Sequence, residues 1–114
     1  MRYRKNTVIL AVAMLCGVAR AQTYFTAHVT AVGTYGDGSL FIFLSTTISE
    51  PGCSAGSSRI DIAGTHPQVK TFYTTALAAF ASGATVIGTV NGCDPASGSP
   101  TFDTTKVSYL YLQP

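Results

Sequence analysis

The sequence has no C-x-x-C pair, no cluster of basic residues after residue 20 and no apolar run of membrane-spanning length. Its longest apolar stretch covers residues 7–18, whereas a transmembrane helix needs ~20 apolar residues. A zinc site needs more ligands than one isolated cysteine pair. We therefore expect no membrane span after processing, no metal and no cofactor.

Residues 1–21 have the pattern of a cleavable signal peptide. Three basic residues stand within the first five, the apolar run follows, and Ala19-Arg20-Ala21 offers small residues at both positions that signal peptidase reads. Cys16 follows a leucine, whereas lipoprotein processing needs a small residue there. We expect export to the periplasm or the medium, with residues 22–114 as the mature chain.

Charge in the expected mature chain is sparse and slightly acidic. The whole sequence carries a formal net charge of +2, but four of its seven basic residues lie within residues 1–21. Residues 22–114 contain three basic and five acidic residues, which gives a net charge of −2. A nucleic-acid partner needs a basic surface that displaces counterions from phosphates, so we expect no nucleic-acid ligand.

Two of the three cysteines, Cys53 and Cys93, remain in the expected mature chain. An even pair in an exported protein is typical of a disulfide. Closing a loop of this length would stabilise the fold by roughly 4 kcal/mol on the chain-entropy view. Residues 22–114 are the length of one small domain, and we expect one disulfide-closed domain.

Three segments before residue 64 have strand patterns. Residues 25–33 alternate, residues 40–46 are largely apolar on both faces, and residues 59–63 alternate again. The turn-forming residues 35–39 predict a hairpin between the first two strands. Because the second strand is apolar on both faces, we expect its outer face to be covered, most simply by another copy of the chain. In the first strand we expect four residues on the buried face: Phe25, Ala27, Val29 and Ala31.

Over residues 67–82 the spacing of the apolar residues changes to that of a helix. Pro67 suits a first helical turn and Gly83 suits a helix C-terminus. Residues 84–91 and 104–112 predict two further strands. The apolar residues at helical spacing are Val69, Phe72, Tyr73, Ala76 and Phe80.

The predicted order is β-β-β-α-β-β, a mainly β chain with one helix. Five strands with the helix between the third and fourth are typical of the OB-fold, a small Greek-key barrel. Closure into a barrel would remove exposed strand edges. The alternative is an open α+β sheet with the helix on one face. We expect the OB-fold-like barrel over residues 22–114.

The stretch TFYTTALAAFASGATV, together with the first hairpin, resembles the OB-fold B subunits of subtilase-cytotoxin and pertussis-like toxins. The segments ISEPGC, THPQVK and NGC are more similar still to small exported proteins of Gram-negative bacteria. The toxin resemblance implies a pentameric ring that binds sialylated cell-surface glycans. It also implies a sugar-binding role for Thr26, because Phe25-Thr26 matches a Phe-Ser pair of that family. The family's tyrosine after the helix is absent, since Thr89 and Val90 occupy that region.

Candidate binding residues are Thr26 and, in the hairpin turn, Tyr35, Asp37 and Ser39. Aromatic residues beside hydroxyls suit sugar stacking or a subunit interface, and Phe41, Phe43, Tyr109 and Tyr111 complete this group. His28 and His66, with Glu50 or Asp61, could in principle form an acid–base pair. A solvated His28 and a helix-start His66 are the simpler interpretation.

We therefore expect an exported, non-catalytic binding module with a carbohydrate ligand. The alternative is a structural or accessory envelope protein without a small ligand.

Overall fold

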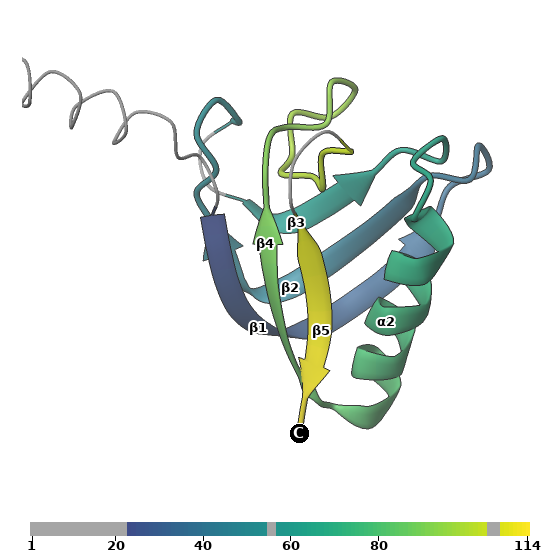
Figure 1. The fold of residues 1–114 in the computed structure, drawn as a ribbon, viewed down its shortest axis with the longest axis vertical. Coiled ribbons are helices and arrows are strands. Elements are labelled where there is room, and N and C mark those ends of the chain that lie inside the picture. The colour runs from purple at the N-terminus through teal and green to yellow at the C-terminus, as the bar shows by residue number, and fades with distance from the viewer. Residues whose placement is uncertain (1–22, 55–56, 105–107) are drawn as a thin grey trace, which may run out of the picture.

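The computed structural model describes residues 23–54, 57–104 and 108–114 (Figure 1). The predicted signal peptide and residues 105–107 of the predicted last strand lie outside the described residues. The predicted order β-β-β-α-β-β is confirmed. The elements of the described residues are β1 (Thr23–Thr34), β2 (Leu40–Ile48), β3 (Ser57–Ile62), α2 (Val69–Ser82), β4 (Thr85–Val90) and β5 (Tyr109–Gln113).

The strands form one sheet in the order β3-β2-β1-β4-β5, and every neighbouring pair is antiparallel. The long strand β1 joins the two halves of the sheet, because residues 23–28 pair with β4 and residues 29–34 pair with β2. β1 is visibly bent along its length, and α2 lies beside the sheet (Figure 1). Among the described residues no ladder joins the edge strands β3 and β5. The sheet is therefore not closed, and the barrel expected from the sequence is not observed.

A β-bulge interrupts the alternation of β1. Val29 pairs with Leu44 and Ala31 pairs with Phe43, so Thr30 is the extra residue on β1. An extra residue shifts the following side chains to the opposite faces. Phe25, Ala27 and Val29 are buried as predicted, but beyond the bulge Val32, not Ala31, packs against the core. The expected burial of Ala31 is therefore wrong.

The core lies between the inner face of the sheet and α2. Phe25 packs across the sheet onto Gly88, where a Cβ would lie 2.6 Å from the ring. Because Gly88 has no side chain, the aromatic ring can cover the backbone of β4. The buried apolar residues are Phe25, Ala27, Val29, Leu40, Ile42, Leu44, Ile48, Ile60, Ile62, Ala76, Ala79, Val86, Val90 and Phe102.

The helix begins two residues later than predicted, at Val69. Its start is held by His66, whose Nδ1 accepts the backbone N–H of Gln68 at 2.9 Å. Its end is as predicted, because Gly83 adopts a left-handed φ of 72° and its N–H donates to the carbonyl of Ala79. Phe80 is 50 % exposed, since Ala79 takes the buried position in the last turn.

The disulfide between Cys53 and Cys93 is confirmed, with the two Cα atoms 5.4 Å apart. It joins the β2–β3 connection to the loop that follows β4, at positions 40 residues apart in sequence. Within the part of the chain that the structure describes, no helix is both long and apolar enough to cross a membrane.

Candidate functional site

A pocket of about 750 Å³ lies where the β1–β2 turn, the end of β3 and the β4–β5 loop meet. These three segments are distant in sequence, so the pocket is a product of the tertiary fold. All three segments contribute charged and hydroxyl-bearing side chains to it. The polar residues that line it are Tyr35, Asp37, Ser39, Arg59, Asp61, Thr65, Asp94 and Ser97.

The first wall is the hairpin turn of residues 35–39. Gly38 has a positive φ of 88°, which is readily accessible to glycine. The Asp37 carboxylate accepts both the hydroxyl of Ser39, at 2.6 Å, and its backbone N–H, at 3.0 Å. The Ser39 hydroxyl, and then its N–H, hold the pKa of the Asp37 carboxyl below its usual value. Asp37 is therefore a preformed, ionised acceptor at the rim.

This turn rests on a glycine from beyond β3. A Cβ on Gly64 would lie 2.8 Å from the carbonyl oxygen of Asp37 and 3.0 Å from the backbone nitrogen of Ser39. Only glycine allows so close an approach of the two backbones. Gly64 therefore sets the distance between the turn and the β3 side of the pocket.

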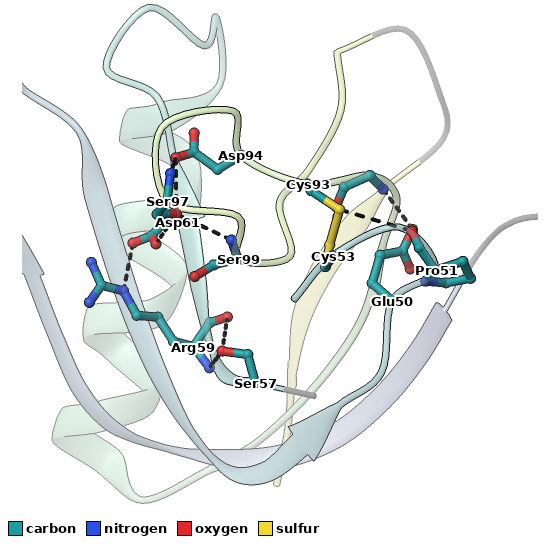
Figure 2. The surroundings of a disulfide bond; sticks show 11 residues. Glu50, Pro51, Cys53, Ser57, Arg59, Asp61, Cys93, Asp94, Ser97 and Ser99 are labelled. Carbon is teal, nitrogen blue, oxygen red and sulfur yellow. Dashed lines mark hydrogen bonds and ion pairs between the residues drawn. A yellow bond between two sulfur atoms is a disulfide. The ribbon is translucent and has the colours of Figure 1, made fainter. Parts of the chain in front are cut away.

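The opposite wall is a hydrogen-bonded chain of charged and hydroxyl groups (Figure 2). Arg59 and Asp61 alternate on β3, so their side chains share one face, and Arg59 Nε donates to Asp61 Oδ1 at 2.9 Å. The Ser97 hydroxyl donates to Asp61 Oδ2 at 2.7 Å, and the Ser97 N–H donates to Asp94 Oδ2 at 3.1 Å. The hydrogen bond to Asp61 is the main cause that raises the pKa of the Arg59 guanidinium.

Arg59 also covers an aromatic cluster on the outer face of β2. Its Cζ lies 5.8, 5.7 and 5.5 Å from the ring centroids of Tyr35, Phe41 and Phe43, within cation–π range. Its Nη2 donates to the Tyr35 hydroxyl. The cover that the sequence led us to expect from a second copy is thus supplied in part by the same chain. Tyr35 remains 49 % exposed at the pocket rim.

The β4–β5 loop is held in place from three directions. The disulfide anchors Cys93, and the buried Glu50 accepts the N–H of Gly92 at 2.7 Å through Oε2. Further along the loop, the carbonyl of Pro100 accepts the backbone N–H of Asp61 at 3.1 Å. Between these anchors lie Asp94 and Ser97 (Figure 2), so the loop is fastened on both sides of the residues that it contributes to the pocket.

No family model, curated protein or solved structure matches this chain. The fold and the geometry of the pocket therefore have to support the argument for function by themselves.

Three of the four predicted binding residues, Tyr35, Asp37 and Ser39, lie together in the pocket. Thr26 does not line it. Thr26 lies exposed on β1 opposite Ile87, which pairs in turn with Tyr111 of β5. The structure thus separates the residue implied by the toxin resemblance from the hairpin-turn residues.

The sequence did not indicate the other charged and hydroxyl-bearing residues of the pocket as binding residues. In Arg59-Ile-Asp61 the alternation places both charges on one face, and this signal could have indicated a surface ion pair. Asp94 and Ser97 have the spacing of a side-chain-capped turn, directly after the disulfide cysteine. Nothing in either local pattern indicates that the two pairs meet.

The histidines lie outside this pocket. His28 is exposed on β1, and its backbone N–H donates to the hydroxyl of Ser45 on β2. His66 lines a second pocket of about 430 Å³ together with Asp94 and Asp103. Its Nδ1 accepts the N–H of Gln68 just before the helix, and its Nε2 has no hydrogen-bond partner among the described residues. Among the described residues, no group of three or more His, Cys, Asp or Glu side chains could hold a metal ion.

Replacing Ser39 with alanine is expected to raise the pKa of Asp37 toward the ordinary aspartate value, because the largest cause of its lowering is removed. The hydrogen bonds to ionised Asp37 stabilise the fold above the ordinary aspartate pKa, and that contribution is lost as the pH falls through the lowered value. A carboxyl-carbon NMR titration measures the shift. Ser45→Ala, which removes a hydroxyl outside the pocket, should leave Asp37 unchanged. An unaltered Asp37 titration in Ser39→Ala would contradict the hydrogen-bonded turn.

Proposed function

We propose that the chain is an exported, non-catalytic carbohydrate-binding protein whose ligand occupies the pocket between the hairpin turn and the β4–β5 loop. The observation that carries the proposal is the meeting of the Tyr35 ring with Asp37, Asp94 and Ser97 in that pocket. Tyrosine offers an apolar face together with a polar tip. Carboxylates and hydroxyls accept strong hydrogen bonds from the hydroxyl groups of a sugar.

The proposal includes an OB-fold-like strand arrangement, and the strand order supports it. In the order β3-β2-β1-β4-β5 the two free edges are those that a five-stranded barrel would bring together. The bond from the Asp61 N–H to the Pro100 carbonyl already links β3 to the β4–β5 connection. OB-folds bind oligosaccharides and oligonucleotides between the β1–β2 and β4–β5 loops, which are the two loops that wall this pocket.

Charge favours the saccharide over the nucleic acid. The charged side chains that line the pocket are the Arg59 guanidinium and the carboxylates of Asp37, Asp61 and Asp94. A phosphate backbone would meet this acidic lining without the basic surface that nucleic-acid binding requires. The toxin resemblance adds a cell-surface glycan as ligand and a pentameric ring as assembly.

The second candidate function is that of a structural or accessory envelope protein. Exposed aromatic side chains on β1 and β5, Tyr24, Tyr109 and Tyr111, favour it. The rings of Tyr109 and Tyr111 lie 5.8 Å apart, away from the pocket, and aromatic residues of this kind are enriched in protein interfaces. The solution mass of the purified protein, and capture of envelope proteins by it, would support this candidate if no glycan binds.

Binding of the purified protein to an array of glycans tests the carbohydrate proposal. Tyr35→Ala should weaken binding about tenfold, because it removes the ring that a sugar would stack on. Tyr111→Ala is the matched control, since Tyr111 is also 49 % exposed and lies outside the pocket. Loss of binding in Thr26→Ala, with Tyr35→Ala unaffected, would move the site to the outer face of β1. A protein that binds no glycan at high concentration would refute the proposal.

A further inference from the structure

We propose that the pocket selects uncharged glycans and rejects those that end in sialic acid, in contrast to the sialylated glycans that the toxin resemblance implies. This inference rests on the proposed carbohydrate-binding function and names the ligand class of the same site. The observation behind it is the imbalance of charge in the lining, where one guanidinium faces the carboxylates of Asp37, Asp61 and Asp94.

Arg59, the cation that a sialic acid carboxylate would need, is already engaged. Its Nε donates to Asp61 Oδ1 at 2.9 Å, its Nη2 donates to the Tyr35 hydroxyl, and its plane lies near three aromatic rings. If Arg59 turned toward a ligand, the carboxylate of Asp61, whose side chain is only 8 % exposed, would lose its charged partner. Leaving a buried charge without its partner is strongly unfavourable.

The two remaining carboxylates are acceptors that can take sugar hydroxyls. Of the two carboxylate oxygens of Asp37, Oδ1 accepts from Ser39, and of the two of Asp94, Oδ2 accepts from the Ser97 N–H. Each carboxylate therefore keeps one oxygen open to a ligand in the described structure. An ionised carboxylate cannot donate a hydrogen bond, so these groups complement the hydroxyls of a neutral sugar. A ligand carboxylate brings only acceptors and a like charge.

The expected size of the discrimination follows from Coulomb repulsion. The carboxylates of Asp37 and Asp94 would both repel the carboxylate of a sialylated ligand. In a largely aqueous pocket, at a few ångströms beyond contact, this repulsion weakens binding of the ligand by about tenfold. Because the pocket is open to solvent, added salt screens the repulsion. The discrimination should therefore shrink as ionic strength rises.

A matched pair of ligands tests the inference: one sialylated oligosaccharide, and the same oligosaccharide after removal of its terminal sialic acid. Titration calorimetry of the oxidised, purified protein should give about tenfold tighter binding for the desialylated ligand at low salt. In the double variant Asp37→Asn and Asp94→Asn the ratio should fall toward one. Asn keeps an acceptor oxygen, so circular dichroism should show an unchanged fold. Asp103→Asn, the same change outside the pocket, should keep the wild-type ratio.

Each other result overturns a definite part of the argument. Equal or tighter binding of the sialylated ligand overturns the charge selectivity and leaves the carbohydrate-binding function standing. A preference for the desialylated ligand that persists in the double variant overturns its electrostatic origin. If neither ligand binds, nor any other glycan, the proposed function itself falls, and the selectivity falls with it.

Discussion

Replacing Cys53 and Cys93 together with alanine is expected to lower the free energy of unfolding by about 4 kcal/mol. The disulfide joins positions 40 residues apart, and its loss releases a long loop in the unfolded chain. Domains of this size bury a modest core and have total stabilities of only about 5–15 kcal/mol. The variant should therefore unfold at a much lower urea concentration than the oxidised wild type, with intact mass confirming the oxidation state.

The same double variant should also lose affinity for any glycan that the wild type binds. Cys93 directly precedes Asp94, and the loop of residues 92–101 holds Ser97 against Asp61. Wild-type protein treated with a reductant serves as the control, because it breaks the same bond without a substitution. A loss of stability below about 1 kcal/mol in both samples would contradict the role given to the disulfide.

Local pattern was sufficient for most of the elements. The alternation of Phe25, Ala27 and Val29 predicted which face of β1 is buried, and Gly83 predicted the end of α2. These features depend on residues within a few positions of one another. The bulge at Thr30 could not be predicted in this way, because it is defined by the pairing of β1 with β2. Ala31 was consequently assigned to the wrong face.

Phe80 illustrates a second limit of periodicity. It stands four residues after Ala76 and fits the predicted apolar stripe, yet it is half exposed while Ala79 is buried. Helical spacing indicates which residues lie near one face. It does not tell which of two adjacent apolar residues, Ala79 or Phe80, faces the sheet in the last turn.

The candidate site was predicted only in the part that is local in sequence. Tyr35, Asp37 and Ser39 belong to one turn, which the turn-forming residues 35–39 predict. Arg59 with Asp61, and Asp94 with Ser97, meet that turn only because β3 and the β4–β5 loop come together in the fold. The closure of the sheet is likewise a long-range property, since element order alone does not determine whether β3 and β5 pair.

The second large effect is expected from Arg59→Ala, which should lower the free energy of unfolding by about 3 kcal/mol. The Asp61 side chain is 8 % exposed and would keep only the Ser97 hydroxyl as a charge-stabilising partner among the contacts described. The aromatic rings beneath the guanidinium would also lose their cover. Urea denaturation of the oxidised variant measures the loss.

A double-mutant cycle separates the ion pair from the packing. If Asp61 is destabilising mainly because it has lost Arg59, then Arg59→Ala combined with Asp61→Ala should cost less than the two single changes added together. Arg59→Lys should recover part of the loss, since lysine retains the charge but not the planar fork that reaches Asp61 and Tyr35 at once. Exposed ion pairs couple by about 0.2–1 kcal/mol. A coupling energy within that range would mean that water, and not the protein, solvates Asp61, and Arg59 would then be free to turn toward an anionic ligand.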